Sequence, residues 1–395
     1  MAFSRMDKNQ RKILLNSNFV KIFAHSPTIW TRAPGRVDLM GSHTDYNQGF
    51  VLTQAIDRDT WIAAHPREDN RVIVHSLNVD GSAEFTLNQK IEYDTQFPWS
   101  NYVRGVADIL RQEGYTLTGF DGLIHSTVPV GSGLSSSAAL EVAVAMLFNS
   151  LGDLKLEPVQ IALLCQRAEN EFVGMNCGIL DQYTSMMGAA DSVLLLDSRD
   201  NSSQIIKIAD GIQIVICDTQ AKRELTGSEY PERRAQCEQG TRILAKFYPG
   251  VTALRDVTLP MFEAHSSDLS PVVAKRCRFV IDENQRVIDI AEAISEGDLG
   301  KIGSLSAQSY AGARDLYEIS SPEMGKMMAA MLSAPGVISA RQTGAGFGGC
   351  MAAFVEDNKI ADFAEHVISH YQTNTGIQPK VYPVQAAPGA GLLDL

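Results

Sequence analysis

Cysteine is scarce in this chain, and its six residues are widely separated. No Cys-x-x-Cys pair occurs, which excludes zinc ribbons and thioredoxin-like redox sites. Isolated cysteines of this kind are typical of buried, reduced thiols, so we expect a cytoplasmic protein. The cysteines stand at positions 165, 177, 217, 237, 277 and 350.

Long apolar runs and an excess of basic residues are also absent. The N-terminus, MAFSRMDKNQRK, is followed by no apolar stretch, so we expect neither a signal peptide nor a membrane span. The chain has 34 Lys and Arg against 46 Asp and Glu, a formal net charge of -12. This balance argues against nucleic-acid binding, which depends on clustered cations. We expect small-molecule partners, no nucleic acid, no membrane and a monomer.

Apolar residues, by contrast, are numerous enough for a large core. The chain has 395 residues, of which 45% are hydrophobic, and this suits two lobes or one large α/β body. Strand and helix patterns intermix without regular alternation, which favours an α+β fold over a Rossmann sheet. The polar stretch SRDNSSQ near residue 200 interrupts the pattern. We therefore expect an N-terminal lobe over 1–200 and a C-terminal lobe over 201–395.

Hydrophobic periodicity predicts the main elements. We expect a helical lead-in over residues 1–30 and a loop over 175–188. Apolar residues at helical spacing predict helices over 101–115, 139–152, 157–174 and 276–295. Alternating or β-branched runs predict strands over 51–66, 70–77, 120–129, 191–198 and 212–219, with further alternating segments at 338–384.

The stretch GSGLSSSAA at 131–139 precedes a long apolar segment. Gly131 and Gly133 permit positive φ and close approach of the backbone to a ligand. Ser135 or Ser136 can cap the following helix, whose free N–H groups and partial positive charge suit a phosphate. A serine hydroxyl nearby can bind Mg²⁺. The alternative is a plain strand-to-helix turn with a serine cap, but the whole string favours a phosphate loop.

Two familiar phosphate motifs do not account for this loop. A Walker A motif requires Gly-Lys-Ser or Gly-Lys-Thr, and neither occurs. A G-x-G-x-x-G match does occur at Gly344, Gly346 and Gly349. A dinucleotide fold needs a long helix after that match, but CMAAFVED is short and strand-like. We interpret this second glycine cluster as a loop that lies against substrate or phosphate.

Three segments together resemble the three motifs of the GHMP family of small-molecule kinases. They are APGRVDLMGSHTDYNQGFVL at 33–52, VPVGSGLSSSAALEVA at 128–143 and RQTGAGFGGC at 341–350. The first is similar to the galactokinase signature, and WSNYVRG, CGILDQYTSMMG and GSEYPERRAQC agree with it. The resemblance implies a two-lobed fold with the active site in the inter-lobe cleft. It also implies phosphoryl transfer from ATP to the anomeric hydroxyl of a sugar, with galactose as the first expectation and galactose 1-phosphate as the product.

The resemblance also implies roles for particular residues. Asp181 in GILDQ matches the catalytic aspartate, a general base or an orienting charge, and Arg36 matches its paired arginine. Ser137 and Glu169 match ligands of Mg²⁺, which takes oxygen ligands and keeps several waters. Trp99 resembles an adenine-pocket aromatic residue, and a core tryptophan is the alternative. The loop residues implied in ATP binding are Gly131, Ser132, Gly133, Leu134, Ser135, Ser136, Ser137 and Ala138.

Sugar contacts follow from the same resemblance. Asp45 can accept hydrogen bonds from adjacent sugar hydroxyls, because a carboxylate has two oxygens. Tyr230 offers a phenol on a rigid ring, and His43 either contacts the sugar or stabilises its loop. The implied sugar-binding residues are Ser42, His43, Asp45, Gly178, Asp181 and Tyr230.

The first motif departs from the galactokinase pattern at two positions. Ser42 stands where the family usually has a glutamate near the sugar C6 hydroxyl, and Asp38 stands where asparagine is common. Losing a charge-assisted hydrogen bond weakens binding by about 1.5–3 kcal/mol. We hypothesise that Ser42 broadens or shifts specificity towards galacturonate, with its C6 carboxylate, or L-arabinose, which has no C6 group. The segment 305–320 also lacks the usual Ser-His pair.

A different class of function is a non-catalytic, galactokinase-like sugar sensor. A known sensor of this lineage lacks a Ser-Ala pair in its phosphate loop, whereas SSSAA is complete here and Asp181 and Arg36 are present. Another alternative is a GHMP kinase that acts on mevalonate or homoserine. GSHTDYNQGF and GSEYPERR argue against it, because they resemble sugar-kinase segments.

Overall fold

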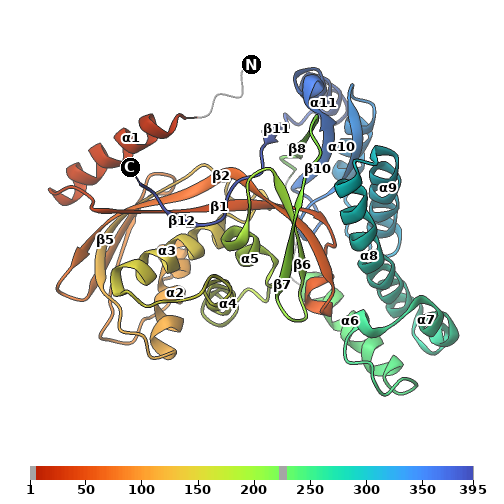
Figure 1. Ribbon diagram of the computed structural model, residues 1–395, viewed down its shortest axis with the longest axis horizontal. Helices are drawn as coiled ribbons and strands as arrows, with labels where there is room; N and C mark the ends of the chain where they lie inside the picture. Colours follow the sequence, from red (N-terminus) through yellow and green to blue (C-terminus); the bar gives the residue numbers. More distant parts are fainter. Residues whose placement is uncertain (1–5, 222–228, 395) are drawn as a thin grey trace.

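The strands of this protein form two sheets in the part of the chain that its structure, a computed structural model, describes: residues 6–221 and 229–394 (Figure 1). The larger sheet has eight strands in the order β12-β1-β2-β5-β3-β4, and β6 and β7 extend from β2. These strands are β1 (Ile29–Met40), β2 (Phe50–Arg67), β3 (Arg71–Ser76), β4 (Ser82–Thr86), β5 (Gly119–Ser126), β6 (Ser192–Asp197), β7 (Ser202–Lys207) and β12 (Gly391–Leu392).

The long strand β2 determines how the larger sheet is arranged. Its beginning, 50–53, pairs with β6, and its end, 60–67, pairs with β5, while β1 runs antiparallel along both parts. Most of β2 is buried, which fits its many apolar and β-branched residues. β1 accommodates Pro34 through a register shift between Pro34 and Arg36. The bulge therefore lies directly beside Arg36, one of the candidate site residues.

Helices cover the two faces of the larger sheet unequally. The helix α1 (Lys8–Phe23) packs on one face, over a small cluster that includes Trp61 and Leu123 (Figure 1). Four helices cover the other face and enclose a much larger core. They are α2 (Asn101–Gln112), α3 (Ser136–Gly152), α4 (Pro158–Arg167), which continues as a π-helical turn (Ala168–Val173), and α5 (Leu180–Met187).

The smaller sheet has four antiparallel strands in the order β11-β8-β10-β9. The helices α10 and α11 pack on one of its faces, whereas its other face packs with α8, α9 and residues of the larger sheet in one buried cluster. The strands are β8 (Ile212–Asp218), β9 (Val337–Gln342), β10 (Cys350–Glu356) and β11 (Lys380–Val384). The helices are α6 (Glu229–Leu244), α7 (Leu259–His265), α8 (Pro271–Glu296), α9 (Leu299–Asp315), α10 (Pro322–Leu332) and α11 (Ile360–Thr375).

The two halves share hydrophobic packing. Leu39 and Leu52 of the larger sheet, Ile216 and Phe354 of the smaller sheet, and Val287 of α8 belong to one buried cluster. The chain also returns near its end, where β12 pairs with β1. A division at residue 200 falls in the turn of the β6–β7 hairpin, and we keep it as a proposal for the two lobes.

The α+β expectation is confirmed, and most predicted helices and strands are present. Three predictions are wrong. Residues 175–188 are not all loop, because α5 begins at Leu180. The lead-in expected over 1–30 omits the start of β1 at Ile29, and the segment 338–384 contains the helix α11. The first five residues, and Gly227 and Ser228 of the GSEYPERRAQC segment, lie outside the described residues.

The six cysteines are free thiols, five of them buried, so the described chain contains no disulfide among them. Within the described ranges, no helix combines the length and apolar character that crossing a membrane requires.

Candidate active site

A cavity of about 700 Å³ lies where the phosphate loop, the loop after β1 and the third glycine motif meet. Its walls come from both halves of the chain. Three of the predicted site residues are absent from its lining: Ser132, Leu134 and Ala138. The others do line it: Arg36, Ser42, His43, Asp45, Trp99, Gly131, Gly133, Ser135, Ser136, Ser137, Glu169, Gly178, Asp181 and Tyr230.

The phosphate loop turns sharply before α3. Gly131 and Gly133 have φ of 72° and 88°, and Ser135 has φ of 58°. Ser135 occupies the N-cap position, but the cap expected from a serine is not made, because the left-handed backbone directs its side chain elsewhere. Its buried hydroxyl has no hydrogen-bond partner among the described residues. The loop therefore offers an unused hydroxyl, together with the first N–H groups of a 17-residue helix, to an anion.

Three residues of the phosphate loop stabilise its turn without lining the cavity. The Ser132 hydroxyl donates to the Pro129 carbonyl oxygen over 2.8 Å. Leu134 is buried in the cluster shared by the two halves, and its carbonyl oxygen accepts from the Arg36 N–H at 3.2 Å. Ala138 is fully buried. These residues shape the loop from outside the cavity.

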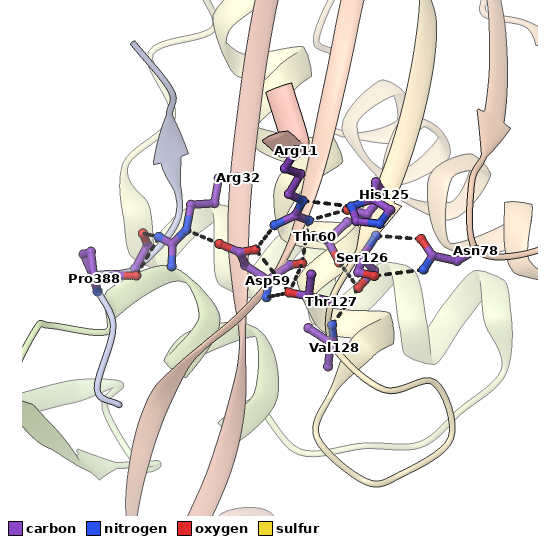
Figure 2. A network of polar contacts seen from close by, with 11 residues as sticks. Arg11, Arg32, Asp59, Thr60, Asn78, His125, Ser126, Thr127, Val128 and Pro388 are labelled. Atoms are coloured by element: carbon purple, nitrogen blue, oxygen red, sulfur yellow. Dashed lines mark hydrogen bonds and ion pairs between the residues drawn. The ribbon is translucent and has the colours of Figure 1, made fainter. Parts of the chain in front are cut away.

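A polar network fixes the base of the loop (Figure 2). Arg11 of α1 and Arg32 of β1 both bind the carboxylate of Asp59, the latter over 2.6 Å. The Asp59 backbone exchanges hydrogen bonds with Thr127, which donates its N–H at 2.9 Å and accepts at its hydroxyl at 3.0 Å. Ser126 then accepts from the N–H of Val128 at 3.1 Å. The segment that enters the phosphate loop is therefore held by contacts from two distant elements.

Arg36 and Asp181 meet in the cavity. The Arg36 Nε donates to Asp181 Oδ1 over 2.8 Å, and its Nη2 lies 2.6 Å from the same oxygen. Its Nη1 donates to the carbonyl oxygen of Gly133 over 2.7 Å. Asp181 occupies the first turn of α5, and 23% of its side chain is exposed. The Arg36 guanidinium thus connects the Asp181 carboxylate, which faces the cavity, with the phosphate loop.

Carboxylates accumulate beside Ser137. The Ser137 hydroxyl hydrogen bonds to Glu169, and burial raises the pKa of Glu169. The Gln182 amide donates to Glu169 over 2.6 Å and to Glu141 over 2.9 Å. Burial, with the charge of Glu169, raises the pKa of Glu141 well above its usual value. A divalent cation bound beside these buried carboxyl groups would favour their ionised forms, so the cluster fits such a cation.

The protein ligands for such a cation are few. The described residues contain no group of three His, Cys, Asp or Glu side chains arranged around a metal. Ser137 and Glu169 line the cavity beside the loop, and both offer oxygen atoms. Two protein oxygens suit Mg²⁺, which keeps several waters and shares phosphate oxygens. The donor set therefore fits the cation that the resemblance implies.

Asp45 and Gly178 pack tightly against each other. A Cβ atom on Gly178 would lie 1.6 Å from Asp45 Oδ2, so only glycine fits at this position. Asp45 Oδ1 accepts from the N–H of Tyr46 over 2.9 Å. Burial, together with the charge of Asp181, raises the pKa of Asp45 to about 6. Asp45 is therefore held in place with one oxygen left for another donor.

His43 links the loop after β1 to the third glycine motif. Its Nε2 lies 2.9 Å from the carbonyl oxygen of Ala345, which can only accept, so this nitrogen carries the proton. Its Nδ1 then accepts from the Tyr46 hydroxyl over 2.9 Å, since burial lowers the pKa of His43 to about 4 and keeps the ring neutral. The Tyr230 ring is 5.2 Å from the His43 ring. His43 both stabilises its loop and lines the cavity.

The third glycine motif forms the turn between β9 and β10, which are antiparallel neighbours. No helix follows it within these residues, so the dinucleotide interpretation is excluded by the structure as well. Gly344, Ala345 and Phe347 line the cavity. A Cβ on Gly344 would lie 3.5 Å from the Gly133 carbonyl oxygen, which places this turn against the phosphate loop.

Trp99 lines the cavity and also packs against the larger core. Its contact with adenine stays a prediction. Several lining residues were not predicted. Phe347 and Ala345 belong to the third motif and could have been inferred from it. The turn after β3 carries no comparable signal, whereas Tyr102 at the start of α2 belongs to the WSNYVRG segment that agrees with the resemblance. Their lining residues are Ser76, Asn78, Val79 and Tyr102.

Family models match three parts of the chain. The galactokinase galactose-binding signature matches residues 17–66, the N-terminal domain of GHMP kinases matches 101–189, and their C-terminal domain matches 290–373. These matches cover the loop after β1, the phosphate loop and the helices beside the third motif. The fold and the site thus define a small-molecule kinase of the GHMP type.

Individual relatives refine this class. A galactokinase from Roseiflexus sp. (strain RS-1) is 41% identical over 377 residues, which are 95% of this chain and 96% of that protein. A crystal structure of Lactococcus lactis galactokinase complexed with galactose has a TM-score of 0.91 and 31% identity, covering 97% of this chain and 100% of that one. A mevalonate kinase shares only the fold, at 18% identity and a TM-score of 0.62 over 91% of this chain and 99% of that one.

The chain belongs to the galactokinase branch of the GHMP kinase family, and it is an ATP-dependent sugar kinase. The resemblance inferred from the sequence and the kinase class are confirmed.

Proposed function

We propose that the protein transfers the γ-phosphoryl group of ATP to the anomeric hydroxyl of galactose, giving galactose 1-phosphate and ADP. The observation that carries this proposal is the contact of Arg36 with both Asp181 and the Gly133 carbonyl oxygen. This contact supports the proposal, because it joins the carboxylate that we assign to the acceptor hydroxyl to the loop that we assign to phosphate binding. Galactose is chosen because both galactokinase relatives match nearly the whole chain.

Asp181 aligns the sugar hydroxyl and receives its proton. The hydroxyl oxygen forms a bond to the γ-phosphorus while the bond from that phosphorus to the β-phosphate oxygen breaks, and ADP leaves. Phosphoryl transfer depends mainly on alignment and on neutralising charge. Arg36 keeps Asp181 oriented, because its guanidinium is held at the other end by the Gly133 carbonyl oxygen.

The phosphate loop holds the triphosphate of ATP through the N–H groups at the start of α3 and the hydroxyl of Ser135. Ser137 and Glu169 would hold Mg²⁺, which neutralises phosphate charge when it is bound. Trp99, at the edge of the cavity lining, provides a flat apolar surface for adenine.

Asp45, His43, Gly178 and Tyr230 form the sugar end of the cavity. Asp45 accepts hydrogen bonds from sugar hydroxyls, and the neutral ring of His43 keeps the third motif in place. Because the Gly178 backbone touches Asp45, the segment before α5 also fixes where the sugar sits relative to Asp181. We further propose a monomer in the cytoplasm, where its six free thiols stay reduced.

A panel of free sugars with Mg-ATP tests the proposal. ADP release is measured for galactose, galacturonate, L-arabinose and glucose, and phosphorus and carbon NMR identify the carbon that carries the new phosphate. We expect the largest kcat/KM for galactose and phosphate on C1. Turnover of mevalonate or homoserine instead, or ATP hydrolysis that no sugar changes, would overturn it.

A further inference from the structure

A second cavity, of about 500 Å³, lies between α1, the middle of β2 and the segment before β12. Its walls come mainly from the start of α1, from residues 57–61 and from residues 386–393. The two cavities have no described lining residue in common, so this one is separate from the candidate active site. A volume of this size is typical of sites that bind small molecules.

Positive charge is in excess in this second cavity. Two carboxylates, Asp57 and Asp59, offset half of its four cations, which leaves a formal charge of +2 on the lining. The whole chain, by contrast, has a formal net charge of -12. A local excess of cations in a concave region of an acidic protein favours an anionic ligand. The four cations are Lys8, Arg11, Arg32 and Arg58.

Arg32 is held rigidly and keeps one nitrogen for a ligand. Its Nε donates to Asp59 Oδ2 over 2.6 Å (Figure 2). Its Nη1 donates to the carbonyl oxygens of Pro388 and Gly389 over 2.9 Å and 3.1 Å. In the part of the chain that the structure describes, no hydrogen bond uses its Nη2. The guanidinium is therefore oriented before any ligand arrives.

Two further residues of the lining carry unused donors. The buried Nε of Arg58 has no hydrogen-bond partner among the described residues, and burial lowers the pKa of Arg58 in spite of the nearby charge of Asp59. Trp61 is 1% exposed, and its indole Nε1 also lacks an acceptor within the described ranges. Buried donors without partners are rare, because each costs free energy. Both donors suit a ligand that is rich in acceptor oxygens.

The rest of the lining narrows the class of ligand. Pro388, Leu392 and Leu393 give it an apolar part, and 53% of Leu392 is exposed. A phosphate monoester carries about 1.5 to 2 negative charges at neutral pH, which matches the charge of the lining. Guanidinium groups bind its oxygens with paired hydrogen bonds. Its organic part would cover the apolar residues, which inorganic phosphate leaves exposed.

The walls of the second cavity also hold elements of the candidate active site. The Asp59 backbone pairs with Thr127, directly before the phosphate loop. The N–H groups of 389–390 donate to carbonyl oxygens within 185–188, at the end of α5, over 2.7 Å and 2.9 Å. The first turn of α5 carries Asp181. A ligand that binds only this arrangement of the walls stabilises the arrangement.

We propose that the second cavity binds a phosphate monoester through Lys8, Arg32 and Arg58, and that its occupation tightens the binding of ATP at the phosphate loop. The bound ester contacts neither ATP nor the sugar. It acts through the base of the phosphate loop, which its contact with Arg32 stabilises. This inference goes beyond the proposed function, because it requires ATP binding but no particular sugar.

Calorimetric titration tests the site. Glucose 6-phosphate, inorganic phosphate and glucose are titrated into the wild-type protein, whose candidate active site is filled with galactose and an unreactive ATP analogue. We expect a Kd of about 0.1–1 mM for glucose 6-phosphate. Inorganic phosphate should bind about tenfold more weakly, since it leaves the apolar lining uncovered. Binding of glucose as tight as that of glucose 6-phosphate would overturn the anion site, and equal affinities for the two phosphates would overturn the ester.

Variants assign the binding to this cavity. Arg58→Gln should weaken glucose 6-phosphate by about 10–100-fold, because a charge-assisted contact is lost. Lys8→Gln, at the exposed start of α1, should weaken it by about threefold or more and decides the matter if Arg58→Gln does not fold. Lys21→Gln is the matched control, since it removes the same charge from the other end of α1, outside the lining. Unchanged affinity in Lys8→Gln and Arg58→Gln, or an equal loss in Lys21→Gln, would overturn the assignment.

The coupling is measured as the Kd of the unreactive ATP analogue with and without saturating glucose 6-phosphate. We expect that Kd to fall by about fivefold or more in the wild-type protein and to stay unchanged in Arg58→Gln. A rise would show competition for the phosphate loop and would overturn the coupling. Tightening of ATP binding without turnover of any sugar would leave this inference standing while the proposed function fails. Turnover of galactose without binding of glucose 6-phosphate would do the reverse.

Discussion

The two ends of the cavity are built from different parts of the polypeptide. The phosphate end is one continuous segment, 131–138, and its donors are backbone N–H groups exposed by positive φ at Gly131, Gly133 and Ser135. The sugar end is made of side chains from separate segments, and most of their atoms already have partners. A short string can specify an anion site because every peptide unit carries the same N–H. A sugar site needs particular side chains that only the fold brings together.

Asp181 lies between the phosphate end and the sugar end of the cavity. Replacing its carboxylate should have the largest effect on activity. Asp181→Asn keeps the shape but removes the carboxylate that receives the proton, so kcat should fall by about 10²–10⁴-fold. The KM values for ATP and galactose should change much less. Steady-state kinetics by ADP release measure both. Asp153→Asn is the matched control, since its side chain is 79% exposed and far from the cavity. A loss of less than threefold in Asp181→Asn would remove it from the chemistry.

Gly178→Ala should damage the sugar end and spare the phosphate end. The new Cβ would lie 1.6 Å from Asp45 Oδ2 and displace that carboxylate. Losing hydrogen bonds to a charged group corresponds to a rise of about 10–100-fold in the KM for galactose. The KM for ATP should stay within about twofold. Gly250→Ala provides the control, because no atom lies within 4 Å of its Cβ position. Equal changes in both KM values would show that the two ends are not separable.

Lowering the pH should weaken the use of galactose before it weakens the binding of ATP. The pKa of Asp45 is raised to about 6 by burial and by the charge of Asp181. Above pH 6 the carboxylate is ionised and accepts from the sugar, and below pH 6 it becomes protonated and loses that capacity. The kcat/KM for galactose should therefore fall by about five- to sixfold between pH 6 and pH 5.

His43 does not obscure this titration, because its pKa of about 4 keeps it neutral throughout the range. Asp45→Asn provides the comparison and should give a flat profile with a lower plateau. Binding of an unreactive ATP analogue, followed at the same pH values, should not change with Asp45. A profile for Asp45→Asn that falls as steeply as that of the wild-type enzyme would assign the titration elsewhere.

Ser135→Gly should have the smallest effect and should appear only at the phosphate end. Glycine tolerates the positive φ of this position, so the variant removes the unpartnered hydroxyl without adding backbone strain. A lost hydrogen bond to phosphate corresponds to a rise of about three- to tenfold in the KM for ATP. The KM for galactose should be unchanged. An unchanged KM for ATP would show that the backbone N–H groups alone hold the triphosphate.

The sequence predicted the elements whose signals are local. The phosphate loop, the strands β2 and β8 and the helix α8 lie where their composition and periodicity indicated. The strand β1 was not predicted, because Pro34 and Gly35 are strand breakers that only a bulge beside a long partner strand accommodates. The helix α5 was read as loop, since Thr184 and Ser185 favour helix weakly and its stability comes from burying Leu180 and Tyr183.

The site residues divide in the same way, between those with a local sequence signal and those that only the fold brings together. Arg36 and Asp181 are 145 residues apart, and only the family resemblance, not the pattern of the chain, suggested that they meet. Asp38 and Arg341 are separated by 303 residues, so the local sequence around Ser42 could not have shown that both side chains bind its hydroxyl. The serine cap was a sound expectation for a Gly-Ser turn. It fails because Ser135 has positive φ and its side chain makes no cap hydrogen bond to α3.

The pairing of β12 with β1 means that the larger sheet is completed by a segment from the end of the chain. Leu392 pairs with Thr31, and Arg32 donates to the carbonyl oxygen of Pro388, 356 residues further along the chain. On a translating ribosome, β1 emerges long before the segment that completes its outer edge. Until then that edge and the arginine below the phosphate loop lack one of their partners. The larger sheet is thus completed only after the smaller sheet has been synthesised.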